Sequence, residues 1–316
     1  MSSFYLPVQF LIKMNTQQIV NDLVIIAEEA GAYIMQFYGK VEDVGKAVGE
    51  TYDCKKDELK TSLTYADIHC QELILLRLLD KYSKFGVLSE ENSEEIVTLE
   101  RNFCHRDTLM DGKYTFLIDP IDGTTNFLNT NAHNFEKKGD PMNKDRFGVQ
   151  ITLMFGEKVI GGVAHLPRLK KTIATVQGGQ TTINDRVINL TKKVFDRNNP
   201  IRIGFFIDKK YMGIDREDLC ALFPNRVSFG ASCYTCYSLL SQEIDAWLLN
   251  RTELLDFGFT ALAYQNAGGF VGGEDSLAIS VSDLIQRTKN GIELIGFMLL
   301  APDGSYHREL IRYISH

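Results

Sequence analysis

The chain has 316 residues and a net charge of −7, because 34 Lys and Arg are outnumbered by 41 Asp and Glu. No long basic stretch is present to follow a phosphate backbone, so a nucleic acid polymer is excluded as the main partner. No apolar run approaches the roughly 20 residues that span a bilayer, so we expect no membrane insertion. The hydrophobic content of 44% suffices for one large core, or for two smaller cores packed together.

The N-terminus and the cysteines predict a cytoplasmic protein. Residues 1–14 are mildly apolar but have neither a basic start nor a small-residue cleavage site, so we do not interpret them as a signal peptide. The six cysteines are scattered along the chain and are expected to be reduced. Cys233 and Cys236 have the CxxC spacing but no second pair for zinc, and we interpret them as two small buried side chains.

The first elements are two helices and a strand. Apolar residues recur every three or four positions over residues 15–38, which predicts an amphipathic helix. A second helix is predicted from Asp67 to about Tyr82. A short apolar run at Val87-Leu88 follows and ends at Glu90, which places an acid at the end of a strand.

A group of strands follows. Residues 114–118 form a compact apolar segment that ends at Asp119-Pro120, and a strand does not easily continue through a proline. Alternating apolar residues predict a half-buried strand over 147–155, with further strands at 159–164 and 172–176. This order is typical of an antiparallel meander.

The second half alternates strands and helices. We predict a strand at 201–207, a helix near 232–242, a strand around 246–249 and a helix that begins at Asp256 and stops at two glycines. The order of elements suggests an α+β or layered α/β protein.

Two polar stretches organise the chain. The stretch at 196–200 suggests an N-terminal half at 1–195, with the metal site, and a C-terminal half at 196–316 that completes the pocket. The polar residues 130–146 are interpreted as a mobile loop.

The most informative stretch is Asp-Pro-Ile-Asp-Gly-Thr-Thr-Asn at 119–126. Asp119 and Asp122 can point into one space with the Ile121 carbonyl between them, which offers the hard oxygen donors that Mg²⁺ prefers. The backbone N–H groups of residues 123–125 would open a helix and form a cradle for phosphate. A metal site and a phosphate site are therefore predicted to adjoin.

A simpler interpretation is that Asp-Pro and Asp-Gly only make turns, as such dipeptides often do. Further acids at element ends argue for a metal site: Glu90 after a strand, Asp67 before a helix and Asp256 before a late helix. Asp67 and Asp256 have the alternative of being plain helix N-caps.

These motifs resemble the inositol monophosphatase superfamily, which also contains fructose-1,6-bisphosphatases, inositol polyphosphate 1-phosphatases and 3'(2'),5'-bisphosphate nucleotidases. The DPxDGTxN signature is whole at 119–126, and the upstream acidic pair and T-x-A-D element match 90–91 and 64–67. The later W-D-x-x-A motif is altered, with Leu255 in place of the tryptophan, while Asp256 keeps the acid.

The resemblance implies an α+β fold, a layered α-β-α-β-α sandwich of the inositol monophosphatase and fructose-1,6-bisphosphatase type. It also implies two or three Mg²⁺ ions, which make a bound water nucleophilic for in-line attack on phosphorus. The residues implied as metal ligands are Glu90, Asp119, Ile121 through its carbonyl, Asp122 and Asp256.

The same resemblance assigns the other roles. The implied catalytic residues are Asp67, Glu90 and Thr124, with Asp67 and Thr124 orienting the attacking water. Sensitivity to Li⁺ is implied as well. The residues expected to bind substrate are Gly123, Thr124, Thr125, Gly230, Ala231 and Ser232.

The substrate is less well defined. Tyr234 stands where nucleotidases and polyphosphate phosphatases keep a lysine, and Leu249 stands where monophosphatases keep a glutamate. Four basic residues precede Phe147 and either contact a second phosphate or form a solvated loop: Lys137, Lys138, Lys144 and Arg146.

We expect a phosphomonoesterase acting on a small phosphorylated substrate, an inositol mono- or polyphosphate. The alternative is a 3'(2'),5'-bisphosphate nucleotidase acting on adenosine 3',5'-bisphosphate, and a remote alternative is a non-catalytic binder of a phosphorylated ligand. Both a monomer and a homodimer are compatible with the resemblance.

Overall fold

The computed structural model describes residues 15–38, 52–128, 145–207, 210–211, 213–279, 285–288 and 291–315. Most of the predicted loop at 130–146 lies outside these residues. Within them, no helix is long and apolar enough to cross a bilayer.

The first sheet contains eight strands in the described part of the chain, in the order β2-β1-β3-β4-β5-β6-β7-β8. β1 runs parallel to β2 and β3, and each later pair is antiparallel, which confirms the predicted meander. The strands are β1 (Gly86–Ser89), β2 (His105–Arg106), β3 (Tyr114–Asp122), β4 (Gly148–Phe155), β5 (Lys158–Leu166), β6 (Lys171–Val176), β7 (Thr181–Ile183) and β8 (Arg186–Val187).

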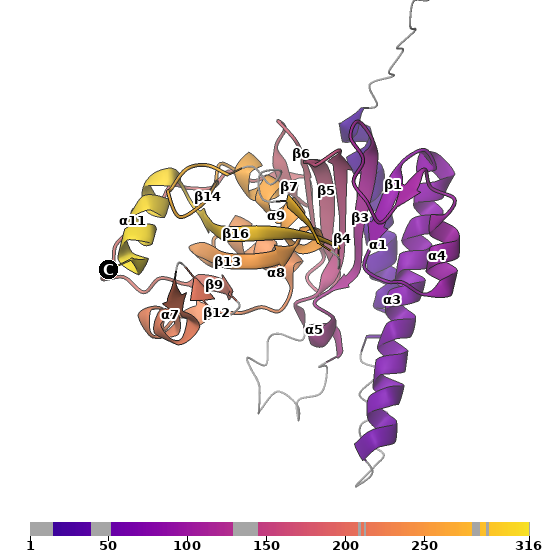
Figure 1. Ribbon diagram of the computed structural model, residues 1–316, viewed down its shortest axis with the longest axis horizontal. Coiled ribbons are helices and arrows are strands. Elements are labelled where there is room, and N and C mark those ends of the chain that lie inside the picture. Colours follow the sequence, from indigo (N-terminus) through magenta and orange to yellow (C-terminus); the bar gives the residue numbers. More distant parts are fainter. Residues whose placement is uncertain are drawn as a thin grey trace, which may run out of the picture.

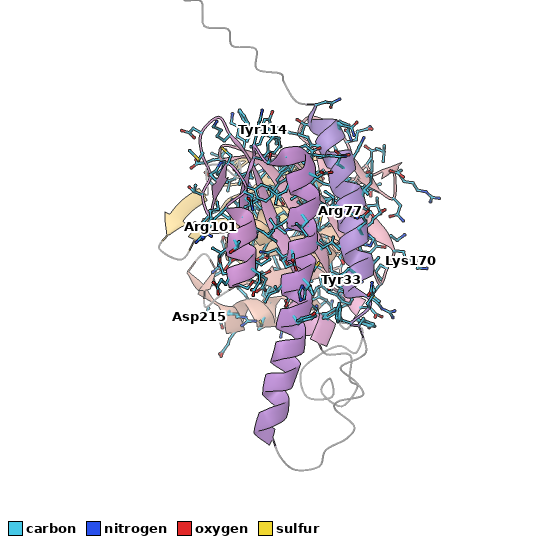
Figure 2. All side chains as sticks on the ribbon, turned by 90° about the vertical axis from the view of Figure 1, so that its right-hand side faces the viewer. Tyr33, Arg77, Arg101, Tyr114, Lys170 and Asp215 are labelled. Atoms are coloured by element: carbon cyan, nitrogen blue, oxygen red, sulfur yellow. The ribbon has the colours of Figure 1, made fainter. Side chains whose placement is uncertain are left out.

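Two long helices cover the outer face of this sheet, α1 (Thr16–Ile34) and α3 (Tyr52–Tyr82). Figure 2 shows them side by side in front of the strands, and each of them contacts the sheet. α1 begins where predicted, because the Asn15 side chain accepts a hydrogen bond from the Gln17 N–H. Two shorter helices follow, α4 (Glu94–Glu100) and α5 (Thr124–Leu128).

The second sheet has six strands among the described residues, in the order β12-β9-β13-β16-β14 with β15 paired to β16. Its strands are β9 (Ile203–Phe206), β12 (Arg226–Val227), β13 (Ala246–Glu253), β14 (Phe270–Gly272), β15 (Ile285–Thr288) and β16 (Gly291–Ala301). A separate pair is β10 (Lys210–Tyr211) with β11 (Ile214–Asp215). The helices of this half are α7 (Arg216–Leu222), α8 (Ser232–Leu240), α9 (Leu254–Asn266) and α11 (Gly304–Ile314).

The elements stack as five layers (Figure 1). α8 and α9 lie between the two sheets and share one hydrophobic core with both. A second core fills the space between the first sheet and α1 and α3, and a third lies between the second sheet and α7 and α11. The predicted α+β sandwich is confirmed, and the burial of both faces of each sheet explains its arrangement. The division into halves at 195/196 stays a prediction.

The predicted helix start at Asp67 is wrong. Asp67 lies inside α3, which begins at Tyr52. The residues before Asp67 include many good helix formers, such as the run Lys55 to Lys60, but they lack an apolar stripe. The sequence pattern therefore detected only the part of a longer helix that has an apolar stripe.

Two other predicted boundaries shift. β3 continues through Pro120 to Asp122, and its pairing with β4 is irregular between Asp119 and Asp122. A bulge leaves the extra residues outside the ladder, so the missing proline N–H costs no hydrogen bond there. α9 begins at Leu254, with Glu253 at the N-cap, so Asp256 belongs to its first turn and is not the cap.

Candidate active site

Two parallel strands deliver the first acids to one edge of the sheet. Ser89 of β1 lies opposite Ile118 of β3, so the residues that follow, Glu90 and Asp119, emerge next to each other. The Glu90 N–H donates to the Ile118 carbonyl at 3.2 Å, which keeps the chain beside β3 after β1 ends. Here the predicted acids at strand ends are brought together.

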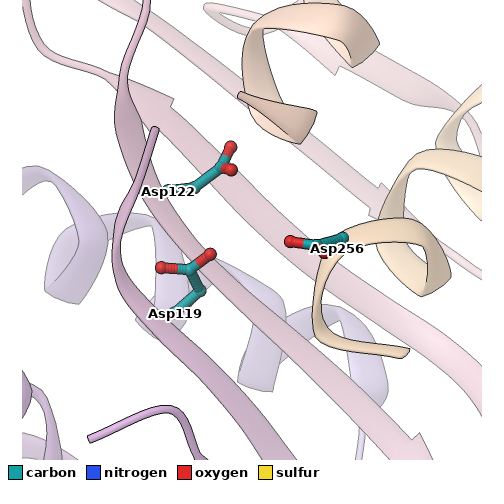
Figure 3. A group of neighbouring side chains, drawn as sticks. All are labelled: Asp119, Asp122 and Asp256. Carbon is teal, nitrogen blue, oxygen red and sulfur yellow. The ribbon is translucent and has the colours of Figure 1, made fainter. Parts of the chain in front are cut away.

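The bulge at the end of β3 brings Asp119 and Asp122 to the same place, and α9 adds Asp256 from the layer between the sheets. Each of these three aspartates can offer one carboxylate oxygen so that the three oxygens lie within 4.8 Å of one another (Figure 3). Asp119 and Asp122 are each only 5% exposed, and Asp256 is half-buried. Figure 3 shows their carboxylates converging on a common space.

The electrostatics of this cluster suit a bound cation. Burial, and then the negative charges of Glu90, Asp122 and Asp256, hold the pKa of Asp119 well above its usual value. Burial also raises the pKa of Glu90 and of Asp122. One buried oxygen of Asp119, Oδ1, has no hydrogen-bond partner in the described part of the chain. Buried carboxylates that include an orphaned oxygen suit a hard divalent cation such as Mg²⁺.

Asp122 also joins the first sheet to α8. Its Oδ1 accepts the Ser232 N–H at 2.9 Å and its Oδ2 accepts the Cys233 N–H at 2.5 Å, so it occupies the N-terminus of that helix. These bonds span more than 100 residues of sequence. They draw the segment 230–232, predicted to bind substrate, towards the aspartates.

At Gly123, just before α5, the chain lies very close to the segments that contain Ala231 and Arg146. Gly123 has a φ of +87°, and a Cβ on it would lie 2.7 Å from Ala231 Cβ and 2.8 Å from the Arg146 carbonyl oxygen. Both the conformation and the space therefore require glycine. Asn126 fastens the same junction, because its Nδ2 donates to the carbonyls of Arg146 at 2.6 Å and Phe229 at 2.7 Å.

α5 begins at Thr124, as the sequence predicted. The N–H groups of Asn126 and Phe127 both donate to the Gly123 carbonyl. The N–H groups that precede them in this first turn have no acceptor within the helix, as at any helix N-terminus. The Thr124 hydroxyl donates to the Ile121 carbonyl at 2.9 Å, so it contacts one of the predicted metal donors. The side chain of Thr125 lies outside the described residues.

Asp67 lies near Glu90 and Glu91 but does not line the cavity at the aspartates. Burial, followed by the charges of Glu91 and Glu90, raises the pKa of Asp67 to about 8. One turn further along α3, the Cys70 thiol donates to the Pro120 carbonyl at 3.4 Å. α3 thus packs, from the outer layer, against the bulge of β3 that carries Asp119 and Asp122.

A cavity of about 250 Å³ opens at this junction. It contains almost every predicted metal and substrate residue that the structure describes. Its lining consists of Glu90, Asp119, Ile121, Asp122, Gly123, Thr124, Phe205, Phe206, Ser228, Phe229, Gly230, Ala231, Ser232, Thr235, Trp247 and Asp256.

The sequence did not predict the aromatic part of this lining or the role of Gln150. Phe205, Phe206 and Trp247 come from β9 and β13, which the sequence predicted as strands without any role in the site. The Gln150 amide is buried on β4 and donates to the Leu255 carbonyl, which holds the start of α9 in place. The available signal was a glutamine on the face of β4 that the alternation predicted to be exposed. α9 covers this face, so both faces of β4 are buried, and the sequence did not reveal this.

Comparison with known proteins agrees with this geometry. Residues 15–273 match the family model described as the inositol monophosphatase family. The chain is 29% identical over 190 residues to a 3'(2'),5'-bisphosphate nucleotidase CysQ of Haemophilus influenzae, which covers 60% of the chain and 59% of that protein. It is 22% identical over 286 residues to an inositol-1-monophosphatase of Mesorhizobium japonicum, covering 87% and 95%.

The fold is also found among solved structures. The extragenic suppressor protein suhB from Bartonella henselae superposes with a TM-score of 0.63 at 21% identity, covering 95% of this chain and all of that one. At this level of identity, the superposition shows that the layered fold is shared.

Proposed function

Because this chain belongs to the inositol monophosphatase family of phosphatases, we propose that its carboxylate cluster serves the Mg²⁺-dependent hydrolysis of a phosphomonoester of a small molecule. The observation that carries the proposal is the convergence of Asp119, Asp122 and Asp256 at a cavity whose rim is the start of α5. Anionic oxygens for a metal and N–H donors for a phosphate thereby adjoin, as phosphoryl transfer requires.

The proposed metal site uses donors of this chain alone. Glu90, Asp119, the Ile121 carbonyl, Asp122 and Asp256 would hold two or three Mg²⁺ ions. When bound, the ions supply a water of lowered pKa and neutralise charge on the phosphate and the leaving oxygen.

The remaining residues bind and orient. The N–H groups of Gly123 and Thr124 would hold the phosphate at the start of α5. Thr124 is already fixed through its hydroxyl to the Ile121 carbonyl, and Asp67 lies next to Glu90 and Glu91. We assign Asp67, Glu90 and Thr124 to the positioning and activation of the attacking water.

Two substrate classes remain candidates. Inositol phosphates are favoured by the sequence motifs and by the name of the Mesorhizobium relative. A nucleoside bisphosphate is the second candidate, supported by the name of the Haemophilus relative and by the aromatic lining of the cavity.

The five cysteines with described side chains are free, which supports the expected cytoplasmic location.

The test is phosphate release from inositol 1-phosphate, inositol 1,4-bisphosphate, adenosine 3',5'-bisphosphate and fructose 1,6-bisphosphate, with Mg²⁺, with EDTA and with added Li⁺. We expect turnover with Mg²⁺, none with EDTA, and inhibition by Li⁺. Asp119→Asn and Asp256→Asn each remove one metal donor and should lower kcat roughly a hundredfold or more.

The matched control is Asp218→Asn, which removes an exposed carboxylate of α7 and should leave turnover unchanged. Undiminished turnover in EDTA would contradict the metal-dependent mechanism. Absence of turnover with every substrate would favour the non-catalytic binder instead.

A further inference from the structure

We infer that Phe206 selects the leaving group, and that the preferred substrate is a phosphorylated sugar carrying a planar aromatic ring, as in a nucleoside phosphate. This inference rests on the proposed phosphatase function and deepens it. It reverses the order of the two candidate substrate classes.

The strand register places Phe206 on the side of the second sheet that faces the cavity. Gly204 and Phe206 of β9 pair with Trp247 and Leu249 of β13, and paired residues of neighbouring strands share a face. Trp247 and Leu249 belong to the core between the sheets, whereas Phe205 belongs to the core on the opposite face. Phe206 is thus directed towards the layer that contains the site.

Phe206 differs from its aromatic neighbours in being open. It is 50% exposed, while Phe205, Phe229 and Trp247 are each 8% exposed or less. Phe229 is held by stacking, with the Arg146 guanidinium 4.8 Å from its ring centre. Within the described residues no aromatic ring packs on Phe206. Among the described residues, Phe206 is therefore the aromatic side chain of the cavity lining that presents an open ring face.

The chemistry of this wall suits a flat apolar group better than a polyol. Hydroxyl groups lose their hydrogen bonds to water on entering a site and need partners there, and phenylalanine rings offer none. A planar ring needs only contact, and stacking of a base on an aromatic side chain contributes directly to binding. Leu249, the neighbour of Phe206 on β13, is fully buried and adds no polar group.

The same cavity also has a polar part close to the acids. Ser228 and Ser232 line it, and the Ser232 N–H donates to the Asp122 carboxylate. A sugar placed between the proposed metal site and Phe206 can bond the exposed Ser228 side chain while its ring substituent covers Phe206. That division of the cavity matches a nucleoside phosphate.

The experiment compares Phe206→Leu with the wild type on adenosine 3',5'-bisphosphate, inositol 1-phosphate and glycerol 2-phosphate, which has no ring. Leucine keeps the apolar volume and removes the flat ring. We expect the wild type to prefer the nucleotide in kcat/KM, and the variant to raise KM for the nucleotide about tenfold with kcat little changed. KM for glycerol 2-phosphate should change less than twofold. Phe155→Leu, at a half-exposed phenylalanine on β4, is the matched control.

A second readout does not depend on turnover. Trp247 is the only tryptophan of the chain and lines the cavity, so its fluorescence reports on binding. In Asp119→Asn protein, adenosine 3',5'-bisphosphate should change this fluorescence, and Phe206→Leu should raise the measured Kd about tenfold. Equal loss for all three substrates, or wild-type preference for inositol 1-phosphate, would overturn the inference while leaving the phosphatase proposal intact. Nucleotide binding that depends on Phe206, without turnover of any substrate, would support the inference and refute the phosphatase.

Discussion

Asp122 has two roles that are separable by mutation. As a proposed ligand it offers an oxygen to the metal, and as a cap it accepts the N–H groups of Ser232 and Cys233. Asp119 has an orphaned oxygen instead, and its charge is opposed by three neighbouring acids. The two aspartates should therefore differ in what they contribute to the stability of the metal-free protein.

This difference predicts opposite outcomes for two matched substitutions. In EDTA at pH 8, Asp122→Asn leaves one N–H facing an amide donor and should lower the free energy of unfolding by about 1–3 kcal/mol. Asp119→Asn removes the repulsion between Asp119 and the neighbouring acids, and it should leave the free energy of unfolding unchanged or raise it. Urea denaturation measures both. Equal destabilisation by the two variants would show that the capping bonds of Asp122 have no effect on stability.

At the scale of elements, a single glycine sets how closely α1 packs on the first sheet. A Cβ on Gly31 would lie 2.3 Å from Cδ2 of His165 on β5. The imidazole cannot easily move, because its Nδ1 is 2.9 Å from the Thr172 hydroxyl, which donates to the Glu28 carboxylate at 2.7 Å. A glycine inside a helix is therefore retained here for packing, in spite of its low helix propensity.

Gly31→Ala tests this contact. Alanine favours the helix by about 1 kcal/mol, but the clash should cost more, so we expect a net loss of about 1–2 kcal/mol in the free energy of unfolding. In a His165→Ala background the same change should become stabilising. Thermal or urea denaturation of the four proteins completes the cycle. An identical effect in both backgrounds would exclude His165 as the cause.

At the scale of the whole molecule, the proposed metal site joins the sandwich layers. Asp119 and Asp122 come from the first sheet, and Asp256 comes from α9 between the sheets. Without a cation these carboxylates repel one another across the junction, and burial raises the pKa of Asp119 and of Asp122. A bound cation should therefore stabilise the assembly of layers, and protons should compete with it.

The predicted pH dependence follows from the direction of these shifts. Because the pKa of buried Glu90, Asp119 and Asp122 is raised, and that of Asp67 reaches about 8, the folded metal-free protein binds more protons than the unfolded chain between about pH 4 and 8. This contribution to stability is present at low pH and is lost as pH rises through that window. Mg²⁺ should then raise Tm more at pH 8 than at pH 5.5.

Differential scanning calorimetry in Mg²⁺ and in EDTA at the two pH values measures the effect. With Mg²⁺ at about 100 times its Kd, the expected stabilisation is about 2.7 kcal/mol, or several degrees in Tm. Asp256→Asn should reduce the shift at pH 8, since it removes a donor. A shift of the same size at both pH values would mean that protonation of the cluster does not compete with the metal.

The sequence by itself determined the local chemistry of this protein. The order of acid, proline, acid, glycine and threonine at 119–126 predicted the start of α5, because this outcome depends on neighbouring residues, although β3 ends at Asp122 and not at Asp119. The alternation in 147–155 predicted β4 and the meander for the same reason. The helix starts predicted at Asp67 and Asp256 were misplaced, because α3 begins in a segment of good helix formers without an apolar stripe and α9 begins at the buried pair Leu254 and Leu255.

Only the tertiary structure decided which distant residues meet. Asp122 meets α8 and Gln150 meets α9 across 111 and 105 residues of sequence, and Phe206 lines the same cavity as the aspartates; no local pattern encodes these contacts. Their partners are selected by the packing of whole layers, in which every face of both sheets must be covered. The acids of the proposed metal site are therefore readable from sequence motifs, whereas the shape and the aromatic wall of the pocket arise from how the two sheets and the helices between them pack.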